Sequence, residues 1–142
     1  FKNMIFREIN EHDYALYKQL IQSEIDIEYF KYFINNILNK NHKIIIMEVN
    51  NSIIGTGTIL IEEKLTYGGS KLGHIENVLI NKNDRGKGYG EMLVKELLKI
   101  CKKEMCYRVD LNCVKELEEF YNKSNFNKNT ISMNIYFKEN FN

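Results

Sequence analysis

The sequence has no proline and no tryptophan, and it contains only three cysteines among 142 residues. Long apolar runs are also missing: none approaches the roughly 20 residues of a membrane-spanning helix, and the first residues lack a signal-peptide pattern. We therefore expect a cytoplasmic protein with no membrane partner. Cys101, Cys106 and Cys113 match neither a zinc ribbon nor a C-x-x-C redox pair, which predicts buried free thiols. The histidines show no metal-ligand spacing, so we expect no metal site.

The charge balance is almost even, since 20 Lys and Arg residues face 19 Asp and Glu residues, for a formal net charge of +1. Nothing in that balance favours a nucleic-acid partner. A hydrophobic content of 44% and a charged content of 27% are typical of globular proteins. The length suits one hydrophobic core, so we expect a single domain over residues 1–142.

Apolar residues recur with strand periods and helix periods in turn along the chain. The pattern predicts strands over residues 4–9, 43–49, 52–61, 72–80, 107–111 and 131–137. The strand over residues 107–111 is expected to be short and buried. The pattern also predicts a helix that ends near residue 21, and further helices over residues 26–38, 91–104 and 115–123. The helix over residues 91–104 has an apolar stripe along one face, which we expect to be buried. The turn signal Asn50-Asn51 joins two strands into a hairpin. Gly55 and Gly57 lie on one side of the second strand, which indicates that a neighbour or a ligand comes close there. The fold class is therefore α/β with a mixed sheet: mostly antiparallel, with one parallel pair made by the crossover through residues 78–111, and with helices on both faces.

A glycine-rich loop, Arg85-Gly86-Lys87-Gly88-Tyr89-Gly90, lies between a predicted strand and a predicted helix. Glycines leave the backbone N–H groups unobstructed, and a helix N-terminus adds the positive end of its dipole. This combination suits a pyrophosphate.

Two known nucleotide-binding patterns also bind phosphates through a glycine loop and a helix N-terminus, but this sequence matches neither of them well. A phosphate-binding loop of the Walker type needs Lys followed by Ser or Thr, whereas Gly90 is followed by Glu91, so nucleotide hydrolysis is disfavoured. A dinucleotide fold would place an acidic residue near Asp110, but a β-hairpin precedes the glycine loop, and a doubly wound sheet cannot be built from this chain.

The loop fits the [QR]-x-x-G-x-[GA] motif of the GNAT superfamily of N-acetyltransferases, and the element order resembles that fold across nearly the whole chain. Phe120-Tyr121-Asn122-Lys123-Ser124-Asn125-Phe126 resembles the F-Y-x-K-x-G-F segment of the same superfamily, with Asn125 in place of the glycine. The resemblance implies that acetyl-CoA is the acyl donor, with Arg85 and Lys87 attracting its phosphates. It implies donor contacts from the strand, the loop and the later segment: Val78, Leu79, Ile80, Arg85, Gly86, Lys87, Gly88, Tyr89, Gly90 and Tyr121.

Within the superfamily, three segments resemble glucosamine-6-phosphate N-acetyltransferases: residues 61–67, 73–78 and 107–113. The resemblance implies acetyl transfer to the amine of glucosamine 6-phosphate, giving N-acetylglucosamine 6-phosphate for UDP-GlcNAc biosynthesis. It also implies a homodimer whose final strand, residues 131–137, helps to build an acceptor site shared by two chains.

That family resemblance also assigns roles to individual residues. The amine attacks the thioester directly, Tyr121 is the acid that protonates the CoA thiolate, and Glu76 and Asn112 act beside it. Acceptor contacts are implied for Lys64, Tyr67, Glu76, Asn77, Asn112 and Tyr136. Asn77, Asn112 and Tyr136 stand where the family usually carries charged side chains, so three acceptor-side charges are changed.

Two other functions remain open from the sequence. One is an enzyme of the same superfamily that acetylates another amine, such as a protein or polyamine, and the other is a non-catalytic acyl-CoA-binding module. Lys64 and Lys71 make the region before the glycine loop locally basic, which favours an anionic acceptor over a polyamine.

Overall fold

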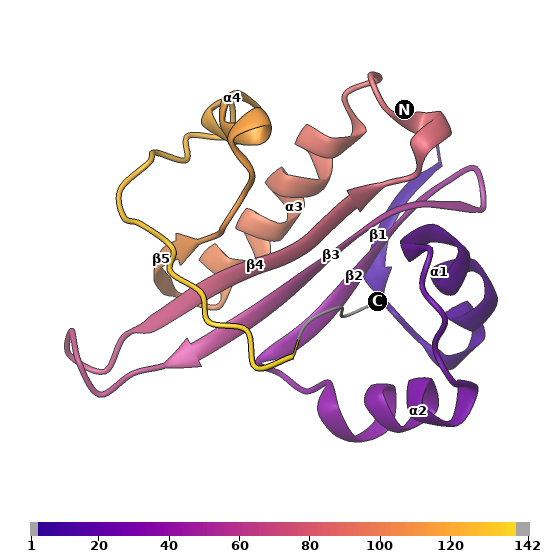
Figure 1. Ribbon diagram of the computed structural model, residues 1–142, viewed down its shortest axis with the longest axis horizontal. Helices are drawn as coiled ribbons and strands as arrows, with labels where there is room; N and C mark the ends of the chain where they lie inside the picture. The colour runs from indigo at the N-terminus through magenta and orange to yellow at the C-terminus, as the bar shows by residue number, and fades with distance from the viewer. Residues whose placement is uncertain (1–2, 139–142) are drawn as a thin grey trace. The chain divides into compact units, whose positions relative to one another are not determined.

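The computed structural model describes residues 3–138, which fall into two compact units divided between Leu111 and Asn112 (Figure 1). The first unit contains a five-stranded sheet in the order β1-β2-β3-β4-β5. The strands are β1 (Met4–Glu8), β2 (His42–Val49), β3 (Ser52–Glu63), β4 (Lys71–Ile80) and β5 (Cys106–Asp110). Neighbouring strands are antiparallel except β4 and β5, which are parallel. The predicted mixed sheet is confirmed.

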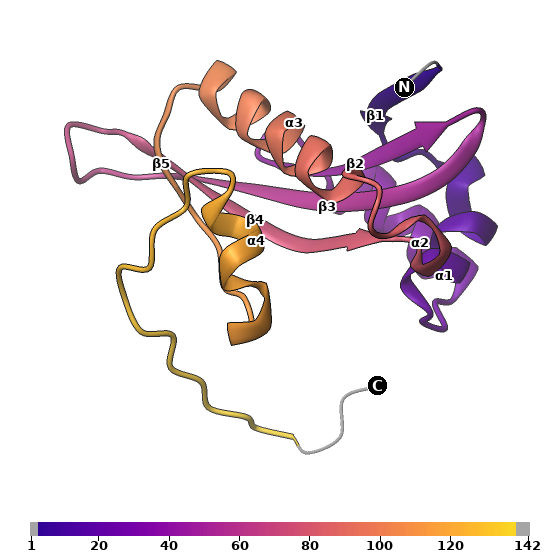
Figure 2. The same ribbon diagram turned by 90° about the horizontal axis from the view of Figure 1, so that it is seen from above.

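Helices cover both faces of this sheet (Figure 2). Helix α3 (Tyr89–Lys103) lies on one face, and α1 (Tyr14–Ile21) and α2 (Ile27–Tyr32) lie on the other. A short turn, η1 (Glu11–Asp13), precedes α1, and α2 continues into a wider π turn, η2 (Phe33–Ile37). The predicted helix over residues 26–38 is therefore correct in place, although its last part is wider than an α-helix.

Close packing of α3 explains two glycines inside β3. The apolar stripe of α3 is fully buried, and a Cβ atom added at Gly57 would lie only 2.7 Å from Leu97 Cδ1. Gly55 lies on the same side, where an added Cβ would meet Ile80 and Leu93. The sequence indicated that a neighbour or a ligand approaches these glycines, and the structure shows a neighbouring helix.

In this chain without proline, asparagines occupy many of the positions that have a left-handed backbone. In residues 3–138, five of the non-glycine residues with positive φ are asparagines: Asn3, Asn50, Asn51, Asn77 and Asn125. Asn50 and Asn51 have φ values of 51° and 67°, as a two-residue hairpin turn with two left-handed residues requires. The predicted hairpin between β2 and β3 is confirmed.

An ion cluster fastens β1 to the turn before α1. The Arg7 guanidinium donates two hydrogen bonds to Asp13, at 2.8 and 2.7 Å, and one to Glu48 on β2 at 2.9 Å. Asp13 is 5% exposed and also accepts from the Asn10 backbone N–H. Burial by itself would raise the pKa of this carboxyl, but the Arg7 and Asn10 hydrogen bonds outweigh burial and hold the pKa below its ordinary value.

Asp13→Asn should lower the free energy of unfolding at pH 7 by about 3 kcal/mol, because it leaves Arg7 with a weaker partner. A depressed pKa contributes stability that is fully present above the unfolded-state pKa of about 3.9 and disappears as the pH falls through the lower folded-state pKa. The difference in the free energy of unfolding between wild type and variant should therefore disappear below about pH 4, as urea titrations at several pH values would show. Glu24→Gln, at an exposed ion pair with Lys18, is the control and should change little. A constant gap down to pH 2 would contradict the assignment.

The cysteines are free but differ in exposure. Cys101 is buried on the sheet-facing side of α3, Cys106 is intermediate and Cys113 is exposed, so the expectation of buried thiols is wrong for Cys113. Cys113 follows the end of β5, where no helix face buries it. Burial, followed by the neighbouring Cys106, raises the pKa of the Cys101 thiol to about 12.

Titration of the native protein with an aromatic disulfide reagent at pH 8 should show one fast-reacting thiol. We expect this thiol to be Cys113, because thiolate character and access decide the rate. Cys101 should react only after unfolding. Cys113→Ser should abolish the fast phase, and a fast phase that survives in Cys113→Ser would refute this order.

The second unit contains a short turn, η4 (Lys115–Leu117), and helix α4 (Glu118–Asn122). Together they match the predicted helix over residues 115–123. The predicted strand over residues 131–137 is wrong, since the segment has no strand pairing and its apolar side chains are more than three quarters exposed. Its alternating pattern is that of a strand, but no strand in residues 3–138 pairs with it.

Among the helices of residues 3–138, none combines the length and the apolar character that crossing a membrane requires.

Candidate active site

Strand β4 is broken in its second half by a bulge. Thr56 pairs with Leu79 and Thr58 pairs with Glu76, so a single β3 residue lies opposite both Asn77 and Val78. Asn77 has a left-handed backbone with φ 51°, a conformation that asparagine tolerates better than most side chains. The bulge bends β4 and turns part of its backbone away from the ladder.

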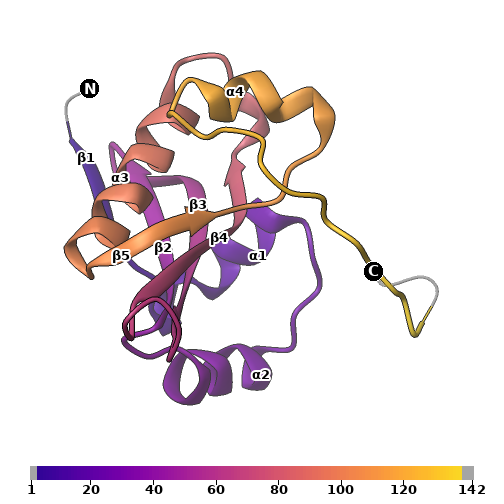
Figure 3. The same cartoon turned by 90° about the vertical axis from the view of Figure 1, so that its left-hand side faces the viewer.

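The same half of β4 has a free edge. Strand β5 pairs with β4 only from Lys71 to His74, and Figures 1 and 3 show β5 beside this first part alone. No strand in the described part of the first unit pairs with residues 75–80 on the side away from β3. Backbone N–H and C=O groups around Val78 are therefore available to an extended ligand.

The glycine loop follows the free edge directly. After η3 (Lys82–Asp84), Gly86 and Gly88 have φ values of 78° and 87°, which only glycine adopts easily. A Cβ atom at either glycine would meet nothing within 4 Å, so space lies open above the loop. Gly88 caps α3 without a side-chain hydrogen bond, and the helix begins at Tyr89, two residues before the predicted start. The first N–H groups of α3 therefore face an open site for an anion.

The two basic residues of the loop differ in role. Arg85 Nε donates to the Ile80 carbonyl at 3.0 Å, which ties the loop back to the end of β4. Lys87 is half exposed, and its Nζ lies 3.9 Å from Asp84. Arg85 was expected to attract phosphates, and its hydrogen bond to the Ile80 carbonyl also shapes the loop backbone. Lys87 is a second exposed positive charge of this loop.

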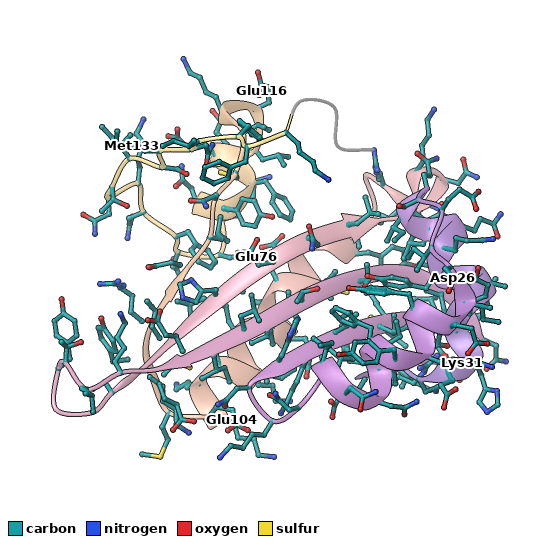
Figure 4. The ribbon with its side chains drawn as sticks, turned by 60° about the horizontal axis from the view of Figure 1, so that its bottom comes forward. Asp26, Lys31, Glu76, Glu104, Glu116 and Met133 are labelled. Atoms are coloured by element: carbon teal, nitrogen blue, oxygen red, sulfur yellow. The ribbon has the colours of Figure 1, made fainter. Side chains whose placement is uncertain are left out.

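One acceptor-side candidate, Glu76, lies on the sheet face opposite α3. Because Gly57 faces α3, Thr58 and its cross-strand partner Glu76 face the other way. Glu76 is exposed, and Figure 4 shows its side chain standing off β4. His74 shares this face two residues earlier and contacts Glu62 Oε1 at 3.1 Å through Nε2.

Lys64 is also engaged by Glu62, at 3.3 Å from Oε2. The hydrogen bond from His74, and then that from Lys64, lowers the pKa of the Glu62 carboxyl. Glu62 thus joins a residue of the following loop to a residue of β4. The sequence pointed to Lys64 but missed Glu62 and His74, which only their cross-strand proximity reveals.

Tyr67 lies in the loop between β3 and β4, with φ 53° and its ring centroid 5.0 Å from that of Tyr107 on β5. Tyr107 and Arg108 are exposed, so the expectation that this strand is buried is wrong. The strand forms the edge of the sheet, where side chains meet solvent. Asp110, considered above as the acidic residue of a dinucleotide fold, accepts two hydrogen bonds from Arg108, at 3.0 and 3.2 Å.

The remaining predicted site residues belong to the second unit. Tyr121 in α4 is 8% exposed, and its ring makes edge contacts with Phe120 and Phe126 at 4.9 and 5.9 Å. Burial, and then Cys113, raises the pKa of its phenol. Asn112 and Tyr136 are exposed.

Asn125 explains one departure from the family motif. It has φ 70°, just beyond α4, where a left-handed residue commonly ends a helix. Asparagine is the usual substitute for glycine in that conformation. The Phe126 N–H then returns to the Tyr121 carbonyl at 3.2 Å, so the turn closes in spite of the substitution.

The first unit therefore offers a free strand edge, a glycine loop and a helix N-terminus whose cap is a glycine, in succession along the chain. These are complementary to an amide-containing arm that ends in a pyrophosphate. Residues 3–138 hold no group of three or more His, Cys, Asp or Glu side chains placed to bind a metal. The backbone groups of the β4 edge, the glycine loop and the first turn of α3 suit the binding and orientation of a thioester that carries such an arm.

Comparison with known proteins gives one family match and several structural matches. A profile of the acetyltransferase (GNAT) family matches residues 6–126. A glucosamine 6-phosphate N-acetyltransferase of Arabidopsis thaliana is 38% identical over 90 residues, which cover 63% of this chain and 60% of that protein. The chain spans about three fifths of the length of the first curated relatives it matches.

Solved structures agree with the fold. The crystal structure of glucosamine-6-phosphate N-acetyltransferase from Arabidopsis thaliana superposes with a TM-score of 0.89 at 28% identity, covering 96% of this chain and 100% of that one. A predicted acetyltransferase with acetyl-CoA from Clostridium acetobutylicum superposes with a TM-score of 0.71 at 26% identity, covering 94% and 96% of the two chains.

Proposed function

Because the chain belongs to the acetyltransferase (GNAT) family, we propose that it transfers the acetyl group of acetyl-CoA to the amine of glucosamine 6-phosphate. The observation that carries the proposal is the bulged, unpaired half of β4 leading directly into the glycine loop. This order of features serves a donor that has an amide arm and a pyrophosphate. The Clostridium structure was solved with acetyl-CoA, in support of that donor.

The donor's pantetheine arm pairs with the free edge of β4 near Asn77 and Val78, in the manner of an added strand. Its pyrophosphate accepts hydrogen bonds from the loop that carries Gly86 and Gly88 and from the first turn of α3. Arg85 stabilises the loop conformation through the Ile80 carbonyl. Holding both substrates in place contributes about 7 to 11 kcal/mol to lowering the barrier.

In the chemical step the amine nitrogen bonds to the acetyl carbonyl carbon, and the carbon–sulfur bond then breaks. A backbone N–H near the β4 bulge stabilises the oxyanion. Tyr121 gives its phenol proton to the thiolate and recovers a proton, through solvent, from the acetylated nitrogen. Glu76 and Asn112 orient the amine. Lys64, Tyr67, Asn77 and Tyr136 complete the acceptor contacts.

The acceptor is supported by the relatives, of which several are named glucosamine 6-phosphate N-acetyltransferases. Lys64 begins the loop that follows β3 and is paired with Glu62 at 3.3 Å, and its charge beside the acceptor-side face favours a phosphorylated sugar. A thiol-release assay with acetyl-CoA should therefore show turnover with glucosamine 6-phosphate and much less with glucosamine, spermidine or a lysine peptide. Turnover with only spermidine or the peptide would overturn the acceptor, and CoA binding without any turnover would indicate a binding module.

The apolar alternation of residues 131–137 supports a homodimer. Ile131, Met133, Ile135 and Phe137 occupy alternate positions and are 81 to 95% exposed. We propose that this exposed apolar segment packs against a second copy of the chain. Light scattering after size exclusion should give twice the chain mass, and Ile135→Asp should give the chain mass. A wild-type monomer at micromolar concentration would contradict the dimer.

We further propose that residues 1–142 act as one N-acetyltransferase domain in the cytoplasm. The free cysteines suit a reducing compartment, which supports this location. Fractionation of the source cells should recover the activity with cytoplasmic markers, and recovery with an organelle would exclude the cytoplasm.

A further inference from the structure

The loop between β3 and β4, residues 64–70, is held near its tip by a ring contact with β5. The Tyr67 and Tyr107 ring centroids lie 5.0 Å apart with 34° between the planes. The Arg108 guanidinium carbon lies over the Tyr107 ring at 5.3 Å from its centroid. Tyr107 therefore contacts both an aromatic ring and a cation. Aromatic pairs favour offset or edge-to-face packing, and a cation favours the face of a ring.

Asp110 fixes the cation in place. Its two carboxylate oxygens accept from Arg108 Nε and Nη2 at 3.0 and 3.2 Å, and this two-point contact orients the guanidinium plane. We call Tyr67, Tyr107, Arg108 and Asp110 the aromatic clamp. Three of its four members lie on β5, which pairs with the beginning of β4.

The loop backbone needs such a clamp, because three successive residues are left-handed. Tyr67, Gly68 and Gly69 have φ values of 53°, 70° and 78°. A tyrosine in this region is strained and persists only where surrounding contacts hold it. Backbone hydrogen bonds within the loop, Gly69 N–H to Thr66 at 3.1 Å and Lys64 N–H to Ser70 at 3.0 Å, depend on the same conformation.

We propose that Tyr107 is a positioning residue that sets acceptor specificity by holding this loop. The proposal rests on the proposed function, in which Lys64 and Tyr67 meet the acceptor. Lys64 begins the loop and is paired with Glu62 at 3.3 Å, while Tyr67 is held by Tyr107, so both residues have fixed positions before the acceptor binds. Acceptor affinity then depends on a residue of β5 that does not itself touch the acceptor.

Tyr107→Leu, which removes the ring, and Tyr107→Phe, which keeps it, form the test pair. Tyr32→Leu is the matched control, because Tyr32 is a 53% exposed tyrosine on α2 outside the clamp. Hydrogen–deuterium exchange of the peptide covering residues 64–70 should be at least fivefold faster in Tyr107→Leu and unchanged in the other two variants. Unchanged exchange in Tyr107→Leu would overturn the clamp.

Steady-state kinetics tests the specificity part. Tyr107→Leu should raise KM for glucosamine 6-phosphate about tenfold while kcat and KM for acetyl-CoA stay within twofold, and Tyr107→Phe should restore the acceptor KM. Faster exchange with an unchanged acceptor KM would overturn the role in specificity. If the wild type did not turn over glucosamine 6-phosphate, the proposed function and this specificity would both fall. The exchange measurement would still decide whether Tyr107 holds the loop.

Discussion

Tyr121→Phe should lower kcat by about a hundredfold, equivalent to about 3 kcal/mol of barrier, with little change in KM for either substrate. The variant keeps the ring that packs against Phe120 and Phe126 and loses only the phenol oxygen. Because burial raises the phenol pKa above its ordinary value of about 10, the wild-type donor stays protonated through neutral pH. An alkaline decline of kcat caused by Tyr121 should therefore begin only above about pH 10.

Tyr17→Phe is the matched control for this experiment. Tyr17 is 9% exposed against 8% for Tyr121, and burial raises the pKa of both phenols, but Tyr17 belongs to the buried face of α1 and packs in the core cluster with Phe30. Its loss of a hydroxyl should leave kcat unchanged. Equal kcat values for wild type and Tyr121→Phe over the whole pH range would remove Tyr121 from the chemical step.

Gly88→Val should weaken acetyl-CoA binding on the order of a hundredfold, measured as the Kd of CoA by calorimetry and as KM for acetyl-CoA. A β-branched residue at φ 87° strains the loop. Its side chain would also fill the open space above the loop, where we propose that the pyrophosphate lies. The KM for the acceptor should change much less.

Gly68→Val is the control that distinguishes backbone strain from loss of the proposed pyrophosphate site. Gly68 has φ 70° and likewise no atom within 4 Å of an added Cβ, but it lies in the loop between β3 and β4. Its valine variant should disturb the acceptor KM and leave CoA binding near the wild-type value. Equal losses of CoA affinity in both variants would mean that general destabilisation, and not the glycine loop, determines donor binding.

Local sequence signals were sufficient for most of the fold. The pair Asn50-Asn51 predicted the hairpin because two left-handed residues define that turn, and the apolar stripe of α3 predicted its buried face. Periodicity could not distinguish an edge strand from a central one, so β5 was expected to be buried although Tyr107 is exposed. The same limit applies to residues 131–137, where alternation specifies a face but not the strand that pairs with it.

The site was predictable where it depends on backbone geometry, as in the glycine loop. Contacts between side chains distant in sequence were not, because no motif encodes them: Glu62 with His74, and Tyr67 with Tyr107. The bulge at Asn77 also lacks a sequence signal of its own. From the sequence, Asn77 was noted only because the family usually has a charged side chain at this position. In the structure its backbone has φ 51°, and this conformation helps to form the bulge of β4.

The left-handed asparagines bear on how the protein ages. A side-chain amide hydrolyses slowly with heat and time, and this makes asparagine a thermolabile residue. Here asparagines hold the β2–β3 turn, the β4 bulge and the turn after α4. Deamidation at these positions would add negative charge and, where isoaspartate forms, would insert an extra backbone atom. Long storage at warm temperature should therefore damage the turns that shape the molecule while the apolar core remains chemically intact.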